Sequence, residues 1–129
     1  MKREAWIFDV DGTLANVDSI LHYVVNKDRE SESFKKDFNK FHGESINVPP
    51  HFDVAQMLWD AKYDQLDIIV VTARKEEWRA HTAYWLKKHN LSHDALFMRG
   101  NKDNRPDYEV KKDILDHIKL FWEPIHAVD

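Results

Sequence analysis

The chain has 129 residues and a formal net charge of −4, and 43% of its residues are hydrophobic and 33% charged. This is the composition of a single globular domain, and it excludes a disordered chain, a collagen-like chain and a coiled-coil fibre. A mildly acidic domain also lacks the broad basic face that non-specific binding to duplex DNA requires. The absence of cysteine excludes disulfide frameworks, thiolate zinc sites and cysteine nucleophiles.

Short apolar runs alternate with helical patterns along the chain. The apolar runs cover residues 5–8, 66–71, 95–98 and 125–128. Runs of this kind are typical of strands that are buried on both faces of a parallel sheet. The alternation therefore predicts an α/β class with an open, three-layer fold around a central parallel sheet.

Three helices are predicted between these strands. The first follows a pair of prolines, and Asp53 with Gln56 resembles a capping box at its start. The second covers residues 76–89, and the third begins with Asp107 as its cap and ends before Pro124. Tryptophans at helical spacing are expected in the core: Trp59, Trp78, Trp85 and Trp122.

Residues 15–48 interrupt this alternation, because they lie between the first strand and the helix expected to follow it. They include apolar residues at helical spacing: Ile20, Leu21, Val24, Val25, Phe34, Phe38 and Phe41. We predict a small, mainly helical cap insertion in a single domain that covers residues 1–129. An insertion after a strand lies where α/β folds bind ligands. Two interpretations stay open: a lid over a site, or a packed decoration that covers the edge of the sheet.

Targeting segments and glycine-rich loops are missing from the sequence. The chain reaches Asp9 too early for the apolar stretch of a signal peptide, and no run approaches the roughly 20 apolar residues of a membrane span. We therefore expect a cytoplasmic domain with no membrane partner. The three glycines, at positions 12, 43 and 100, form no Walker A loop, GxGxxG fingerprint or GxSxG elbow. Phosphate chemistry would therefore depend on side chains and a metal ion.

A polar side chain directly follows each of the four predicted strands: Asp9, Thr72, Arg99 and Asp129. In a parallel sheet the carboxyl ends of the strands lie at one edge, so we expect these four side chains to converge on one crevice. Each of them alone could be an ordinary turn residue, but the four together predict a site.

Residues 9–13 (DVDGT) are the most specific part of this pattern. The carboxylates of Asp9 and Asp11 repel each other unless a cation or a shared proton intervenes. Mg²⁺ suits this position, because proteins bind it through one or two carboxylates together with substrate phosphate. Gly12 permits a tight turn, and Thr13 offers a hydroxyl and a backbone N–H. The alternative interpretation is an Asp-Gly turn with solvated acids.

Residues 9–14 (DVDGTL) resemble the first motif of the haloacid dehalogenase (HAD) superfamily of phosphohydrolases. Residues 70–74 (VVTAR) resemble its second motif, Lys111 resembles the lysine of the third, and Asp129 resembles the first acid of the fourth. Residues 99–111 carry the arrangement R-x₃-D-x-R-x-D-x₂-V-K. This arrangement is similar to the phosphatase domain of phage polynucleotide kinase/3′-phosphatases, and the resemblance covers nearly the whole chain.

The resemblance implies a Rossmann-like HAD fold and a Mg²⁺-dependent phosphomonoester hydrolase. Asp9 would be the nucleophile that forms an aspartyl-phosphate, and Asp11 would act as general acid and then general base. Thr72 and Lys111 would bind the phosphoryl oxygens. The resemblance further implies that Mg²⁺ would be held by Asp9, the Asp11 carbonyl and Asp129, and would offset charge on the phosphoryl oxygens.

The resemblance also implies a substrate, the 3′-phosphorylated end of a polynucleotide. Arg74, Arg99 and Arg105 would hold a second, non-reacting phosphate by forked hydrogen bonds. The turn at Gly12 and Thr13 would also contact the substrate. The alternative for the arginines is pairing at the surface with acidic neighbours: Asp103, Asp107 and Glu109.

One departure from the family concerns the fourth motif, which is usually a pair of aspartates. The chain stops at Asp129, so we expect the strand and helix that normally follow to be missing and metal binding to be impaired. Two other functions therefore stay open: a nucleotidase or small-molecule HAD phosphatase, and a catalytically inactive, HAD-like binding module. A receiver-type phosphate acceptor is disfavoured, because Thr72 occupies the place of its acceptor aspartate.

Overall fold

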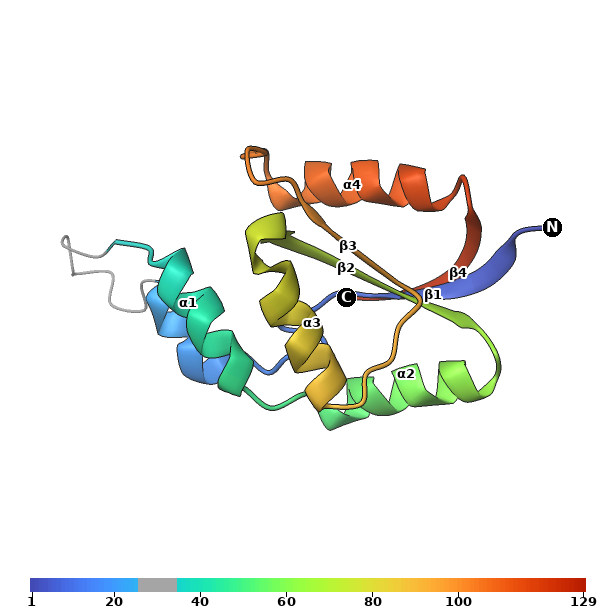
Figure 1. Cartoon of the computed structure of the whole chain (residues 1–129), viewed down its shortest axis with the longest axis horizontal. Helices are drawn as coiled ribbons and strands as arrows, with labels where there is room; N and C mark the ends of the chain where they lie inside the picture. Colours follow the sequence, from blue (N-terminus) through green and yellow to red (C-terminus); the bar gives the residue numbers. More distant parts are fainter. Residues whose placement is uncertain (26–34) are drawn as a thin grey trace.

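The computed structural model describes residues 1–25 and 35–129. Its elements, including three 3-10 helices (η), follow in chain order: β1 (Arg3–Phe8), η1 (Asp18–Tyr23), α1 (Phe38–Glu44), η2 (Ser45–Asn47), α2 (Phe52–Tyr63), β2 (Asp67–Lys75), η3 (Glu76–Trp78), α3 (Arg79–Lys88), β3 (Ala95–Arg99), α4 (Asp107–Ile118) and β4 (Trp122–Val128). The described strands form one parallel sheet in the order β3-β2-β1-β4. Helices α2 and α3 lie on one face and α4 on the other (Figure 1). The predicted three-layer α/β fold is confirmed.

The central strand β2 shows why its sequence is a continuous apolar run. Ile68 and Val70 belong to the core cluster that includes side chains of α2 and α3. Ile69 and Val71 point to the other face, where they pack with Ile118 of α4. Successive side chains of a strand alternate between faces, so a strand covered on both sides must be apolar at every position. Burial of each such side chain stabilises the fold by about 1.5–3 kcal/mol.

The order of the strands creates a crevice at the carboxyl end of β1. The chain passes from β1 to β2 on one side, and β4 later takes the place on the other side of β1. In open α/β sheets such a reversal is where ligands bind. Asp9 follows β1 directly, and its backbone N–H donates to the Val128 carbonyl at 3.1 Å. The fold therefore places the DVDGT loop at this position.

The segment between β1 and α2 contains η1, α1 and η2, and packs against one end of the molecule (Figure 1). Its side chains Ile20, Phe41 and Val48 are buried in the same core cluster as those of α2 and α3. Phe38, by contrast, is 52% exposed. The predicted helical insertion after the first strand is present, while Phe34 lies outside the described residues. The boundaries 15–48 stay a prediction.

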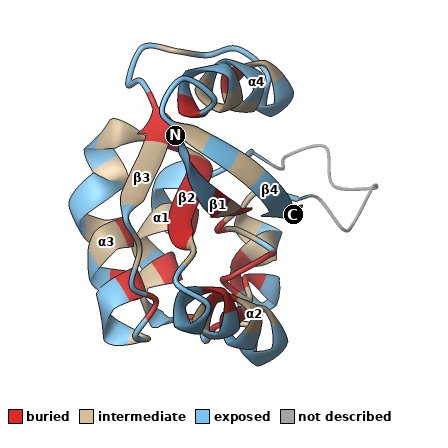
Figure 2. Cartoon of the chain, turned by 90° about the vertical axis from the view of Figure 1, so that its right-hand side faces the viewer, coloured by how far each residue is buried: buried red, intermediate tan, exposed pale blue. Residues whose placement is uncertain are grey.

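All four strands extend beyond the predicted apolar runs, and the extensions are largest in β2 and β4. β2 continues to Lys75, so Thr72 lies inside the strand, because pairing with β3 resumes at Arg99 after a register shift. β4 begins at Trp122 and includes Pro124. A proline is tolerated there because β4 is an edge strand and its register with β1 shifts at this point. As Figure 2 shows, β4 is largely exposed whereas β2 is buried.

Both predicted capping residues prove to lie inside their helices. The N-cap of α2 is His51, without a side-chain capping bond, and Asp53 is in the first turn. The N-cap of α4 is Pro106, and Asp107 instead binds Arg99. An aspartate in the first turn still favours the helix, because its charge lies near the positive end of the helix dipole.

The remaining differences concern helix ends and tryptophans. The predicted helix over 76–89 is divided into η3 and α3, and α4 ends at Ile118, well before Pro124. Trp85 is buried as predicted, and its indole N–H donates to the Val48 carbonyl at 2.8 Å. The other three of these tryptophans are only half-buried: Trp59, Trp78 and Trp122. None of the helices in the described residues has the length and apolar character needed to cross a membrane.

Candidate active site

Asp9 and Lys111 form an ion pair at the carboxyl end of β1. Lys111 reaches across from α4, and its Nζ lies 3.1 Å from Asp9 Oδ2. The Asp9 side chain is only 17% exposed. This burial raises the pKa of the Asp9 carboxyl; the Lys111 cation acts in the opposite direction, and the Asp129 carboxylate adds to the rise. The result is a poorly solvated carboxylate beside one cation.

The DVDGT loop is a tight turn closed by its own backbone. The N–H groups of Thr13 and Ala15 both donate to the Val10 carbonyl, at 3.1 and 2.8 Å. Gly12 adopts φ +79°, in the left-handed region where a residue with a Cβ is strained. The turn therefore requires glycine for its backbone conformation. It places the Asp11 side chain within hydrogen-bond distance of Arg74 on β2.

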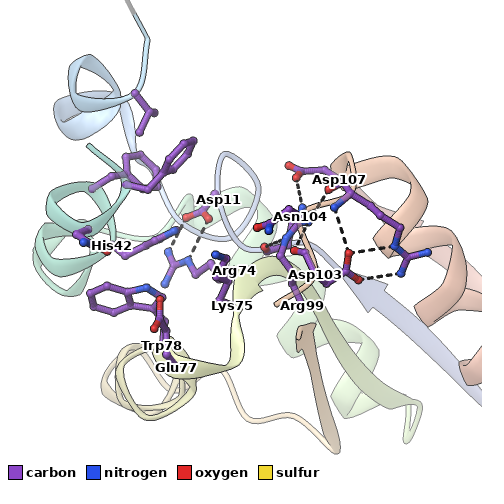
Figure 3. A pocket seen from close by; sticks show the side chains of 16 residues that line it. Asp11, His42, Arg74, Lys75, Glu77, Trp78, Arg99, Asp103, Asn104 and Asp107 are labelled. Carbon is purple, nitrogen blue, oxygen red and sulfur yellow. Dashed lines mark hydrogen bonds and ion pairs between the residues drawn. The ribbon is translucent and has the colours of Figure 1, made fainter. Parts of the chain in front are cut away.

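Arg74 binds Asp11 through both of its carboxylate oxygens (Figure 3). The guanidinium Nε donates to Oδ2 at 3.0 Å and Nη2 donates to Oδ1 at 2.5 Å. A third bond, from Nη1 to Thr82 Oγ1 at 3.0 Å, holds the Arg74 side chain on α3. Arg74 is 3% exposed. Such a forked pair fixes the orientation of the carboxylate as well as its position.

Thr72 lies beneath this pair, on the strand that neighbours β1. The residue is 1% exposed, and its Oγ1 accepts a hydrogen bond from the backbone N–H of Arg74 at 3.2 Å. The hydroxyl hydrogen stays available for a ligand, because a threonine hydroxyl both accepts and donates. Thr72 can therefore offer one hydrogen bond to an anion near Asp9.

The Arg99 side chain is held in place by hydrogen bonds within the protein. Its guanidinium donates to the carbonyls of Ala73, Asp103 and Arg105 and to the Asp107 carboxylate. The side chain thus ties the loop after β3 to β2 and to the start of α4. These bonds use four of the five guanidinium N–H groups, which leaves one N–H on Nη2 for a substrate phosphate.

Arg105 lies on the surface and pairs with two acids. It contacts Asp103 at 2.8 Å and Asp113 at 2.5 Å, and its side chain is 45% exposed. The hydrogen bonds from Arg105 lower the pKa of the Asp103 carboxyl to about 2. The structure thus shows acidic neighbours at Arg105, as in the alternative interpretation, and its role toward substrate stays a prediction.

The oxygens around Asp9 form a set that suits Mg²⁺. Val128 pairs with Phe8 in the sheet, so Asp129 and Asp9 come next to each other at its edge. Hydrogen bonds among the described residues use the carbonyls of Asp9 and Val10 in the turn but not that of Asp11. No group of three or more His, Cys, Asp or Glu side chains in the described chain could hold a metal ion alone. Two carboxylates and a carbonyl nevertheless fit Mg²⁺, which keeps several water or phosphate ligands.

Sequence reasoning missed a second wall of the site, which the helical segment supplies. A cavity of about 520 Å³ lies beside Asp11 and Arg74, and α1 contributes Phe38 and His42 to its lining. His42 faces the Asp11–Arg74 pair (Figure 3). Burial and then the Arg74 charge lower the pKa of His42 to about 4, so its ring is neutral at neutral pH. The one sequence signal for this wall is that His42 follows Phe38 by four residues, a spacing that places both side chains on one face of a helix.

Solved structures share this fold. Two chains from structures of a Pnkp1/Rnl/Hen1 RNA repair complex match with TM-scores of 0.74 and 0.75, at 24% identity and over 98% of this chain. This chain spans only 35% and 38% of their length. A class C acid phosphatase from Bacillus anthracis, solved with tungstate bound, matches with a TM-score of 0.73 at 13% identity, over 99% of this chain and 52% of its own. No curated protein sequence matches the chain.

These likenesses, together with the parallel sheet, show that the chain shares the α/β fold of these proteins. The family model described as the polynucleotide kinase PNKP phosphatase domain matches residues 3–129. The chain therefore belongs to the family of PNKP phosphatase domains. The resemblance stated from the motifs is confirmed, while the roles of the individual site residues stay predictions.

Proposed function

We propose that the chain is a Mg²⁺-dependent phosphomonoesterase that removes the 3′-phosphate from the end of a polynucleotide. The observation that carries this proposal is the poorly solvated Asp9 carboxylate, 3.1 Å from Lys111, with Asp11 in the adjoining turn. Membership of the PNKP phosphatase family supports the reaction class. The RNA repair complex among the structural relatives supports a nucleic-acid end as substrate.

The first step forms a covalent phosphoenzyme on Asp9. One Oδ of Asp9 attacks the phosphorus in line, and the bond between phosphorus and the leaving 3′-oxygen breaks. Asp11, which enters this step protonated, gives its proton to that oxygen, which leaves as the sugar hydroxyl. Arg74 holds Asp11 for this task without using up its oxygens, because each carboxylate oxygen has a second lone pair.

The second step regenerates Asp9. A water molecule attacks the phosphorus of the aspartyl-phosphate, and the bond between phosphorus and Asp9 breaks. Asp11, now ionised, takes a proton from the attacking water, so its two roles balance over the cycle. Inorganic phosphate leaves, and both carboxyl groups return to their initial states.

The groups around Asp9 stabilise the charge that develops during both steps. Thr72 donates its hydroxyl hydrogen to a phosphoryl oxygen, and Lys111 neutralises the carboxylate and a second phosphoryl oxygen. Mg²⁺, held by Asp9, the Asp11 carbonyl and Asp129, would offset negative charge on the phosphoryl oxygens. Among the three candidate arginines, Arg105 is exposed enough to bind a second phosphate of the polynucleotide in place of Asp103 and Asp113.

The test is release of inorganic phosphate from a 3′-phosphorylated oligonucleotide with and without Mg²⁺. The 5′-phosphorylated oligonucleotide and a small aryl phosphate serve as comparison substrates. Asp9→Asn should abolish release, and Asp116→Asn, which removes an exposed carboxylate of α4, is the matched control.

Three outcomes distinguish the possible functions. Release that needs Asp9 and Mg²⁺ and prefers the 3′-phosphate supports the proposal. Turnover of the aryl phosphate alone would instead indicate a small-molecule phosphatase. No release from any substrate would support the catalytically inactive binding module, and substantial activity in Asp9→Asn would contradict the assigned nucleophile.

A further inference from the structure

The cavity beside Asp11 lies on the leaving-group side of the site. Asp11 and Arg74 are among its lining residues, whereas Asp9 and Lys111 are not. Since Asp9 attacks the phosphorus and Asp11 protonates the opposite, leaving oxygen, the group that departs must extend past Asp11. The cavity of about 520 Å³ is therefore placed to receive the nucleoside and not the phosphate. Its volume is within the range of roughly 300–1,000 Å³ typical of sites for small ligands.

One wall of this cavity is aromatic. The rings of Phe38 and His42 on α1 stack at 6.2 Å with 26° between their planes, and Trp78 of η3 lies 5.4 Å from His42. Phe38, His42 and Trp78 all line the cavity, and we call them the aromatic wall. Phe38 is 52% exposed, and the Lys36 ammonium lies 6.0 Å from the centroid of its ring, so a base that stacks there would replace a mobile surface cation. Aromatic surfaces of this kind bind nucleobases by stacking, whatever the base sequence.

Much of the rest of the cavity lining is charged and contains both cations and acids, the acids being Asp11, Glu77, Asp103 and Asp107. Arg74, Lys75 and Arg99 contribute to its lining from β2 and β3. The three residues of the aromatic wall come instead from the helical segment and η3, so the cavity has two chemically distinct sides (Figure 3). A nucleotide matches both sides, because it has an apolar π-face and a charged backbone.

His42 adds a polar contact that the fold leaves unused. Its Nδ1 is buried and has no hydrogen-bond partner in the described structure. A buried polar atom without a partner is unfavourable unless a ligand or water supplies the missing hydrogen bond. The neutral ring can either donate or accept there, depending on its tautomer, and this bond would lie in the plane of the ring, beside the stacked base.

From these observations we propose that the cavity binds the base of the terminal, 3′-phosphorylated nucleotide by stacking on Phe38, His42 and Trp78. The inference rests on the proposed function, because the position of the leaving group follows from the roles of Asp9 and Asp11. It assigns the helical segment after β1 a role in substrate recognition: α1 supplies two of the three rings.

The experiment compares two oligonucleotides that differ only in the presence of the terminal base. One ends in a normal 3′-phosphorylated nucleotide, and the other ends in a 3′-phosphorylated abasic sugar. Dissociation constants are measured with the Asp9→Asn protein, so that binding is read without turnover. We expect the base to strengthen binding about tenfold or more. Phe38→Ala and His42→Ala should reduce this ratio toward one, and Phe52→Ala, which removes an exposed aromatic ring outside the cavity, should leave it unchanged.

The possible results separate this inference from the proposed function. Equal affinity for both oligonucleotides, or no measurable binding of either, would overturn the inference. An unchanged ratio of the two affinities in Phe38→Ala would also overturn the inference. This variant alters an exposed side chain and should fold, which circular dichroism can verify. Base-dependent binding without phosphate release by the wild-type protein would uphold the inference and contradict the function. Equal turnover of both oligonucleotides with equal affinities would uphold the function and contradict the inference.

Discussion

Arg74 and Asp11 are joined by two parallel hydrogen bonds, although 63 residues separate them in the sequence. Arg74 is almost fully buried, and Asp11 belongs to the loop that carries the proposed nucleophile. From the sequence, Arg74 was predicted to hold a substrate phosphate. That role stays a prediction, and the observed contact suggests a second one, in which Arg74 orients Asp11, the proposed general acid.

Arg74→Lys should distinguish these two roles. Lysine keeps the charge but cannot make the forked contact, so Asp11 loses its fixed orientation. We expect kcat to fall at least tenfold with a smaller change in KM, and the free energy of unfolding to fall by about 2 kcal/mol. Steady-state kinetics and urea denaturation measure both, with Arg79→Lys at an exposed ion pair as control. A change confined to KM would favour the phosphate-binding role.

Lys111→Met tests the environment of Asp9, the proposed nucleophile. Burial already raises the pKa of Asp9, and Lys111 opposes that effect, so its removal should raise the pKa further. Because Asp9 must be ionised to attack, the acidic limb of the pH–rate profile should move to higher pH. We also expect kcat/KM to fall about a hundredfold, as when one charge-stabilising donor is lost. Lys112→Met, the exposed neighbour, should change neither quantity.

His42 should make folding stability depend on pH. Its pKa is about 4 in the fold, against an ordinary value of 6.5. Between these values the unfolded chain binds a proton that the folded chain does not, so stability falls as the pH drops from 6.5 toward 4. Denaturation at pH 6.5 and 4.5 should show a loss of roughly 2 kcal/mol from this residue. His42→Gln should remove that loss, and His126→Gln at an exposed position should preserve it.

Asp67 ties three strands together at the amino end of the sheet, away from the site. It accepts hydrogen bonds from Arg3 Nε at 2.9 Å and from Trp122 Nε1 at 2.8 Å, and the contact with Arg3 is the main cause of its lowered pKa. Its stabilising effect is therefore present above the ordinary carboxyl pKa and is lost as the pH falls through the lower value in the fold. Asp67→Ala should lower the free energy of unfolding by about 2 kcal/mol and leave kcat unchanged. Asp64→Ala, at an exposed loop residue, is the control for stability.

Gly12→Ala and Gly43→Ala form a matched pair of backbone tests. A Cβ at either position meets nothing within 4 Å, but only Gly12 has a positive φ, of +79°. Alanine at Gly12 should lower the free energy of unfolding by about 1 kcal/mol or more and slow catalysis, because a Cβ at this positive φ would strain the turn that carries Asp11. Alanine at Gly43, inside α1, should be neutral or stabilising. Equal effects at the two positions would show that the turn does not depend on glycine.

The sheet and the position of the DVDGT loop could be predicted because they depend on local pattern. A run of apolar residues that ends in Asp9 indicates a buried strand and also where it stops. Thr72 shows the limit of this reasoning: its strand continues to Lys75 because β3 supplies partners that no local pattern reveals. The N-cap of α2 was also missed, since His51 forms no side-chain capping bond that a motif could record.

The contacts inside the site could not be predicted, because they join segments that are distant in sequence. The motifs identified Asp11 and Arg74 separately, but only the fold shows that they bind each other. His42 belongs to no motif, and its relevance depends on how α1 packs against η3. Trp78 was expected in the core for its helical spacing, yet it lines the cavity at a half-buried position.

The edge strand β4 connects the proposed chemistry of this domain to the most exposed strand of its sheet. Asp9 is held by a hydrogen bond to Val128, in a strand that is mostly exposed and pairs on one side with β1. Strands of this kind open locally at a lower free energy than the whole domain unfolds. Mild heat or low denaturant should therefore release Asp9, the proposed nucleophile, while β1, β2 and β3 remain paired. The domain would lose its catalytic activity before it loses its fold, and amide hydrogen exchange at Asp9 would report that partly opened, inactive population.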